Sequence, residues 1–189
     1  MTAMIPPEVQ AMLDKQAIWE CLNRYCRGVD RFDADLLRKS YWPDAEDDHG
    51  EFVGNVEDFI KWVFALHELN QISTQHQLTT HNVELDGHTA HTETYYIYTV
   101  RNRDESVWIA GGRYVDRLEK RGGEWRIARR YCITEWSGMV EAGPVPYLDI
   151  PDVHASGVPS RDQSDPSYTR PLVNKRQPRF PQPSVQVGR

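Results

Sequence analysis

One aspartate lies at the end of an apolar helical stripe, where a carboxylate is costly unless it has a partner. The apolar residues recur at steps of three and four, which is typical of one buried face of a helix. They are Ile18, Leu22, Tyr25, Cys26 and Val29. Asp30 lies four residues after Cys26, so a continuing helix projects its carboxylate near the same stripe. A carboxylate that loses its water there needs a hydrogen-bonding partner.

The predicted partner of Asp30 is His76, which stands in the segment Ser73–Leu78. In a neutral imidazole one ring nitrogen donates a hydrogen bond and the other accepts a proton. A carboxylate on the donor nitrogen fixes the tautomer and stabilises the imidazolium that forms during a reaction. Such a pair is a general base. The alternative is that Asp30 is a surface residue at a helix C-terminus and His76 an ordinary strand residue.

Arg130 is a candidate for stabilising negative charge. It shares strand parity with Cys132, whereas Arg129 takes the other face, so a regular strand points one of the two arginines inward. An inward arginine holds an anionic leaving group or an enolate oxygen, or it pairs with a carboxylate. The alternative to a catalytic role is a salt bridge to Asp30 or Glu135.

Tyr25 and His49 are two further candidates. Tyr25 lies five residues before Asp30, and its phenol can donate a hydrogen bond to a substrate oxygen. Because Tyr25 belongs to the apolar stripe, core packing is the alternative. His49 follows Asp47 and Asp48, two carboxylates that raise the pKa of a histidine when they are close. For His49 the alternative is a solvated acidic turn.

Aromatic residues are numerous enough to line a large apolar pocket, with plain core packing as the alternative. They are Trp42, Phe59, Trp62, Tyr96, Tyr98, Trp108 and Trp136. We expect Trp42 and Tyr96 to bind substrate. His81 lies an odd number of residues after His76, so a strand without a bulge puts the two on opposite faces. No histidine spacing is typical of a metal site, and no metal is expected.

Length and charge exclude several classes of protein. The chain has 189 residues, enough for one domain with an appendage, and a net charge of −6 that disfavours nucleic-acid binding. No apolar stretch approaches the roughly 20 residues of a membrane helix. The first residues lack the pattern of a signal peptide. With 3 cysteines and no CxxC motif, we expect a reduced, cytoplasmic protein.

Three helices are expected to precede the strands. The first runs from about Pro7 to Val29, the second over Ala34–Tyr41, and the third begins after a capping Asn55. Glu46–Val53 is expected to be a short strand or turn. Four extended runs then predict an antiparallel meander: Thr74–Leu85, Thr89–Arg101, Val107–Glu119 and Trp125–Trp136. Helices segregated from strands indicate an α+β fold, and a curved sheet around the first helix forms a cone with a pocket inside.

The C-terminal part differs from the rest. Nine of the twelve prolines lie in the last 47 residues, so regular structure is not expected there. We therefore assign residues 1–142 to the cone domain. Residues 143–189 form a Pro-rich extension that is expected to pack on this domain or on a neighbouring subunit.

Five segments in order resemble the SnoaL-like branch of the nuclear transport factor 2-like superfamily. They are Tyr25–Arg31, Tyr41–Ala45, Gly50–Gly54, Thr74–His76 and Trp125–Arg130. The resemblance extends over roughly residues 8–140. It implies the α+β cone. It also points to members such as scytalone dehydratase, hexachlorocyclohexane dehydrochlorinase and bile-acid 7α-dehydratase, which are lyases that use an Asp–His pair and no cofactor.

Individual positions carry this resemblance further. The family aspartate at the end of the first helix matches Asp30, and the family histidine matches His76. Tyr25 matches a tyrosine of the bile-acid enzyme, and Arg130 matches an arginine of the dehydrochlorinase. His49 stands where scytalone dehydratase has a tyrosine that polarises its substrate.

One position departs from the pattern. Arg101 stands where scytalone dehydratase has a second histidine, which argues against a scytalone-type substrate and makes Arg101 a substrate-binding candidate. We expect a cofactor-free lyase that removes water, halide or a small fragment such as formaldehyde from an apolar, aromatic or polycyclic small molecule. The alternatives are an isomerase or cyclase with a lone aspartate as base, and a binding module without chemistry. The resemblance also implies a homo-oligomer, with a trimer favoured over a dimer.

Overall fold

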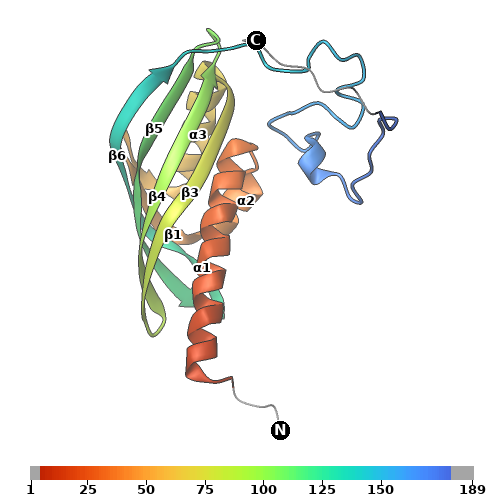
Figure 1. Cartoon of the computed structure of the whole chain (residues 1–189). Coiled ribbons are helices and arrows are strands. Elements are labelled where there is room, and N and C mark those ends of the chain that lie inside the picture. The colour runs from red at the N-terminus through yellow and green to blue at the C-terminus, as the bar shows by residue number, and fades with distance from the viewer. Residues whose placement is uncertain (1–4, 180–189) are drawn as a thin grey trace.

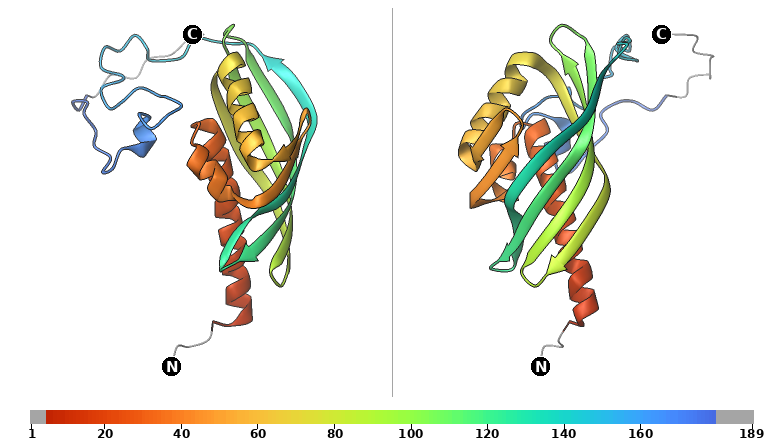
Figure 2. Two further views of the ribbon diagram at one scale, coloured as in Figure 1. Left: turned by 180° about the vertical axis from the view of Figure 1, so that it is seen from behind. Right: turned by 90° about the vertical axis from the view of Figure 1, so that its left-hand side faces the viewer.

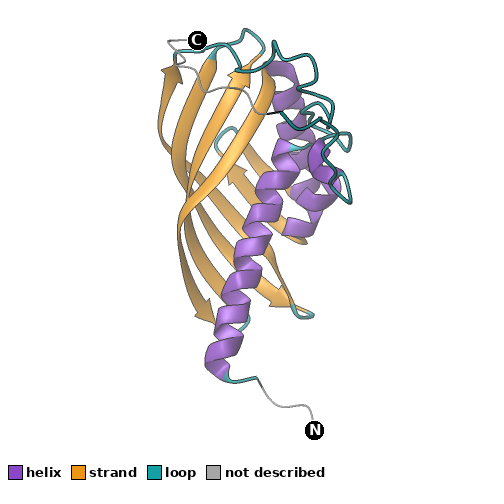
Figure 3. Cartoon of the chain, turned by 45° about the vertical axis from the view of Figure 1, so that its right-hand side comes forward, coloured by secondary structure: helices purple, strands orange, loops and turns teal. Residues whose placement is uncertain are grey.

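The computed structural model describes residues 5–179, which form three α-helices and one six-stranded sheet (Figure 1). The helices are α1 (Pro7–Asp30), α2 (Ala34–Ser40) and α3 (Val56–Asn70). All three lie on the same side of the sheet (Figure 3). The first four residues, where we expect no signal peptide, and the last ten of the Pro-rich extension lie outside the described residues.

The helix boundaries follow local sequence signals and confirm the predicted helices. Pro7 opens α1, where the missing N–H of proline is not needed. The Asp33 carboxylate accepts a hydrogen bond from the backbone N–H of Leu36 and caps α2. The Asn55 side chain accepts one from Asp58 and caps α3. Within residues 5–179 no helix has the length and apolarity that crossing a membrane requires.

The predicted meander is confirmed, but the sheet contains two more strands. Its strands are β1 (Tyr41–His49), β2 (Phe52–Asn55), β3 (Gln71–Asp86), β4 (Thr89–Asn102), β5 (Val107–Arg121) and β6 (Glu124–Val140). Their order is β2-β1-β6-β5-β4-β3, and every neighbouring pair is antiparallel except β1 and β6. The expectation of only a short strand or turn over Glu46–Val53 was too narrow. The first half of β1 was not predicted because Pro43 argues against a strand. It is tolerated there because the register with β6 shifts between Tyr41 and Glu46.

Bulges bend the sheet around α1 (Figure 2). One interrupts the β5–β6 pairing at Gly111 and Gly112, where a Cβ on Gly112 would lie 1.9 Å from the carbonyl oxygen of Ile133. Another interrupts the β3–β4 pairing between Leu78 and His81. This bulge is the exception that the prediction allowed: the His81 ring lies 5.1 Å from that of Trp19 on α1, on the side of the sheet that His76 faces, but His81 does not line the cavity.

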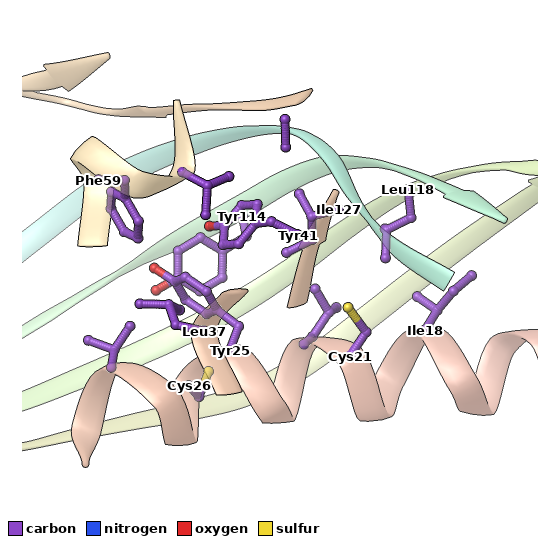
Figure 4. Packing of buried hydrophobic residues seen from close by; sticks show 14 of the residues in the cluster. Ile18, Cys21, Tyr25, Cys26, Leu37, Tyr41, Phe59, Tyr114, Leu118 and Ile127 are labelled. Carbon is purple, nitrogen blue, oxygen red and sulfur yellow. The ribbon is translucent and has the colours of Figure 1, made fainter. Parts of the chain in front are cut away.

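Two groups of side chains fill the cone between α1 and the sheet (Figure 4). One group is mainly aliphatic and includes Ile18, Cys21, Leu118 and Ile127. The other is aromatic and includes Tyr25, Tyr41, Phe59 and Tyr114. The aromatic group lies toward the C-terminal half of α1, where that helix carries Asp30.

The described part of the Pro-rich extension packs on its own domain near the ends of α1 and α3. The Tyr168 hydroxyl donates a hydrogen bond to Asp33 at 2.9 Å. The Arg161 guanidinium lies 3.8 Å from the ring centroid of Phe32 and donates to the carbonyl oxygens of His67 and Gln71. These contacts do not test the homo-oligomer, which stays a prediction.

Candidate active site

Asp30 and His76 meet, as their sequence positions predicted. Asp30 is the last residue of α1, and His76 lies on β3 at the edge of the sheet. The Nδ1 atom of His76 is 2.7 Å from Oδ1 of Asp30. The other carboxylate oxygen accepts a hydrogen bond from the backbone N–H of His76 at 2.9 Å, and Thr74 donates its hydroxyl to Oδ1 at 2.8 Å. Three hydrogen bonds from one strand therefore hold the carboxylate in place.

The surroundings of Asp30 keep it ionised. Burial alone would raise the pKa of Asp30, but the charge and hydrogen bonds of His76, with the hydroxyl of Thr74, lower it below its usual value. An ionised carboxylate only accepts hydrogen bonds, so Nδ1 of His76 is the donor. Nε2 is then the nitrogen that can accept a proton.

His76 lines a cavity of about 460 Å³ between α3, α1 and the concave face of the sheet. The aromatic lining residues are Tyr25, Trp62, Tyr96, Tyr98, Trp108 and Tyr114. The polar lining residues are His49, His67, Gln71, His76, Cys132 and Thr134. A mostly aromatic wall with a few convergent polar groups is typical of a small-molecule site.

A second histidine–carboxylate pair lies in the same cavity. Nδ1 of His49 is 3.0 Å from Oδ1 of Asp47, and the hydroxyl of Tyr41 donates a hydrogen bond to the other oxygen. Burial opposes the charge of His49, but the interactions with Asp47 and Cys132 outweigh it and raise the pKa of His49 to about 10. His49 therefore carries a proton at neutral pH, and the negative charge beside it is the fully buried carboxylate of Asp47.

Tyr25 and Tyr96 also lie where the sequence suggested. The Tyr25 ring packs between core aromatics and lines the cavity, so packing and lining both apply to it. Burial raises the pKa of Tyr25 well above its usual value, so the phenol stays protonated. The Tyr96 hydroxyl is 3.0 Å from the hydroxyl of Thr134, another lining residue.

Arg130 does not line the cavity. Its guanidinium is buried and donates two hydrogen bonds to Asp116, at 2.7 and 2.8 Å. It lies 4.1 Å from the ring centroids of both Tyr25 and Tyr114. The expected partner, Asp30 or Glu135, was wrong because Asp116 is directly opposite Arg130 in the β5–β6 register. We therefore assign Arg130 to the core beneath the cavity.

Trp42 and Arg101 are also outside the cavity lining, which corrects their assignment as substrate-binding residues. Strand alternation explains both cases. Tyr41 points into the core, so Trp42 points away and donates its indole N–H to the carbonyl oxygen of Glu119. Arg101 follows the buried Val100, and its guanidinium lies 3.5 Å from a carboxylate oxygen of Glu105.

Sequence reasoning missed His67 and Gln71 at the end of α3. The Tyr98 hydroxyl donates to Gln71 at 3.1 Å and lies 3.3 Å from Nε2 of His67. Burial, helped by nearby positive charge, lowers the pKa of His67 to about 3, so this ring is neutral. The signal was helical spacing, because His67 falls four residues after Val63 on the apolar stripe of α3.

Among residues 5–179, the acidic, histidine and cysteine side chains do not form any group of three or more arranged to hold a metal ion. The two histidines of the cavity that have carboxylate partners are held as separate pairs. Each pair is able to transfer a proton at its own place in the cavity wall.

Comparison with known proteins extends this description. The sequence model of a SnoaL-like domain matches residues 10–131. No curated protein matches the chain. A type 2 hexachlorocyclohexane dehydrochlorinase is similar in structure, with a TM-score of 0.69 at 15% identity, over 75% of this chain and 99% of that chain.

Two other solved structures show the same likeness. A candidate scytalone dehydratase from Novosphingobium aromaticivorans has a TM-score of 0.63 at 18% identity, over 74% of this chain and 97% of that one. A nuclear transport factor 2-like superfamily protein from Salmonella enterica has a TM-score of 0.60 at 17% identity, over 74% and 98%. At these identities the likeness shows the fold, and the predicted α+β cone is confirmed.

Proposed function

Because the chain belongs to the SnoaL-like domain family, we propose that it is a cofactor-independent lyase that acts on an apolar, aromatic or polycyclic small molecule. The observation that carries the proposal is the His76–Asp30 pair, with Nε2 of His76 available for a proton in an aromatic cavity. The dehydrochlorinase and the candidate dehydratase that share this fold are named for eliminations, which supports the same reaction class here.

His76 removes the proton in this mechanism. Nε2 takes a proton from a substrate carbon next to an activating group, while Nδ1–H keeps its hydrogen bond to Asp30. The ionised carboxylate of Asp30 stabilises the imidazolium that forms. The three hydrogen bonds that this carboxylate accepts fix its orientation toward the His76 ring. A positioned general base contributes about 10²–10⁴-fold to a rate. Positioning and electrostatic stabilisation in the cavity supply the rest.

His49 provides the acid. It is protonated at neutral pH and faces the same cavity, so it donates a proton to a leaving hydroxyl or holds a leaving halide. In a dehydration, a C–H and a C–O bond break, a C=C bond forms and water leaves. After the step His76 releases its extra proton to solvent, and His49 takes up a proton from solvent, so both residues return to their starting states. Tyr25 stays protonated and forms part of the aromatic wall of the cavity, with its ring centroid 6.5 Å from that of His76.

The isomerase and cyclase alternatives assign the base to Asp30. Its lowered pKa and its three hydrogen bonds make this carboxylate a weak base, and its carboxylate oxygens face Thr74 and His76. The binding-module alternative gives the same cavity but no turnover. The isomerase class is separated from the lyase proposal by one pair of variants, and the binding module by the absence of turnover.

The test is a screen of aromatic β-hydroxy and β-halo carbonyl compounds, with the product identified by mass spectrometry. We expect His76→Ala to lower kcat by about 10²–10⁴-fold and to keep the circular dichroism spectrum of the native protein. His91→Gln, an exposed histidine of β4, is the matched control and should keep native turnover. Full activity in His76→Ala, with loss confined to Asp30→Asn, would support the isomerase class instead. The absence of any product across the screen would support the binding module.

A further inference from the structure

Cys132 lies on β6 beside the histidine that the mechanism uses as an acid. The parallel register of β1 and β6 pairs Asp47 with Arg130 and Asp48 with Tyr131. Continuing this register by one residue places His49 next to Cys132. Both side chains line the cavity, and the thiol interacts with the His49 ring. The Cys132 sulfur is also 3.7 Å from the hydroxyl of Tyr96.

Asp47 completes a line of three side chains. Nδ1 of His49 is bound to the Asp47 carboxylate at 3.0 Å, which leaves the other ring nitrogen for the thiol. A thiol and an imidazole in contact share one proton, so the thiolate forms without a change in the net charge of the pair. The carboxylate fixes the orientation of the imidazole in this arrangement.

We infer that Cys132, His49 and Asp47 form a nucleophilic thiol site in the wall of the cavity, which adds to soft electrophiles such as α,β-unsaturated carbonyl compounds. The thiol site does not require His76 and therefore stands apart from the proposed elimination. The two are chemically related, however, because elimination from a β-hydroxy carbonyl compound produces an electrophile of this class.

The addition is balanced without an oxidant or another reactant. The Cys132 sulfur forms a bond to the β-carbon of the unsaturated carbonyl compound, and the C=C π bond breaks. The electron pair moves to the α-carbon through the enolate. His49, which is protonated beside the thiolate, then gives its proton to the α-carbon, so the product is a thioether and the imidazole is left neutral.

The other two cysteines serve as internal controls. Cys21 and Cys26 are buried residues of α1, and the thiol of Cys21 donates to the carbonyl oxygen of Ser40 at 3.3 Å. Burial raises the pKa of Cys21 to about 11 and that of Cys26 further. Neither residue lines the cavity. A small electrophile should therefore distinguish Cys132 from both within one folded chain.

The experiment treats the full-length native protein with N-ethylmaleimide or cyclohexenone at pH 7 and follows the intact mass and the modified peptide. We expect one adduct per chain, on Cys132, and three adducts after unfolding in urea. Cys132→Ser should remove the native adduct. His49→Gln should slow labelling at least about tenfold, because an ordinary free thiol is only a few per cent ionised at pH 7. Asp47→Asn should slow it in the same direction.

The matched control is His91→Gln, which changes an exposed histidine in the same way and should label at the native rate. Labelling of Cys21 or Cys26 as fast as Cys132 would overturn the inference, and so would a native rate in folded His49→Gln protein. If His49→Gln does not fold, the one-versus-three adduct count of the native chain and the Asp47→Asn rate still decide. Labelling needs no turnover, so its failure leaves the lyase proposal intact, and a failed lyase assay leaves the thiol site intact.

Discussion

Asparagine in place of Asp30 keeps the shape of the side chain and removes its charge, so it isolates the role of the carboxylate. Asp30 accepts hydrogen bonds from two side chains and one backbone N–H, all between 2.7 and 2.9 Å. An asparagine has only one oxygen, and its NH₂ group must face a donor. Facing Nδ1 of His76, it would shift the imidazole proton to Nε2 and leave no base toward the cavity. Facing the backbone N–H, it would leave buried donors without an acceptor.

The two orientations set the expected magnitude. A buried polar group without a partner costs about 1–3 kcal/mol, and a hydrogen bond to a charged group contributes about 1.5–3 kcal/mol. At about 1.4 kcal/mol per factor of ten, loss of imidazolium stabilisation alone lowers kcat roughly 10- to 100-fold. A change of tautomer lowers it by up to about 10⁴-fold. We therefore expect Asp30→Asn to lose between about 10- and 10⁴-fold in kcat and about 1–3 kcal/mol in the free energy of unfolding.

The stability difference should depend on pH with a defined sign. The folded pKa of Asp30 is lowered below the usual 3.8, so its contribution is fully present above that value and is lost as pH falls through the folded pKa. Urea unfolding at pH 7 and in acid, with turnover measured on the same samples, tests both parts. Equal stability of the native and Asp30→Asn proteins at pH 7, together with equal kcat, would refute the reasoning.

Three further predictions follow from residues around the cavity. Arg130→Met leaves the buried carboxylate of Asp116 without its partner and should lower the free energy of unfolding by about 3–5 kcal/mol, as measured in urea; adding Asp116→Leu should recover most of the loss. Trp42→Ala removes an indole that lies outside the cavity, so kcat should stay within twofold of the native value (about 0.4 kcal/mol), and a larger loss would show that this side chain reaches the substrate. The folded pKa of His49 is about 10 against an ordinary 6.5, so its contribution to stability is fully present below pH 6.5 and is lost as pH rises toward 10. Urea unfolding at pH 7 and pH 10 should show this loss in the native protein and not in His49→Gln.

The sequence predicted the parts of the site that depend on local periodicity. The stripe of α1 placed Asp30 near the core, and the extended character around His76 placed it on a strand. Capping residues such as Asn55 marked the helix starts. Pairing Asp30 with His76 across 46 positions needed the resemblance as well, because periodicity gives the face of an element but not its neighbour.

Register and bulges account for what the sequence did not predict. A bulge between Leu78 and His81 reverses strand parity, and nothing in the local composition announces it. The register shift between Arg117 and Leu118 likewise lets both Trp125 and Arg130 point inward, although they differ by an odd number of residues. Partner choice also depends on register, which is set by the whole sheet.

The surroundings of His49 were predictable only in part from the alternation of side chains along a strand. Residues two apart on a strand share a face, so Asp47 and not Asp48 was the carboxylate to expect beside it. The sequence did not predict that β6 brings Cys132 beside His49, because β1 pairs in parallel with β6, which is distant in the chain. Long-range parallel pairing leaves no hairpin signal between the strands.

The most direct test of the account is the protonation of His76 in the folded protein. Nitrogen-15 NMR of histidine-labelled protein, with the His76 signals assigned by their loss in His76→Gln, distinguishes the two neutral tautomers. The account predicts the proton on Nδ1, bound to Asp30, and an unprotonated Nε2 toward the cavity. A neutral ring with its proton on Nε2 would contradict it, because the nitrogen that faces the substrate would then have no lone pair to accept a proton.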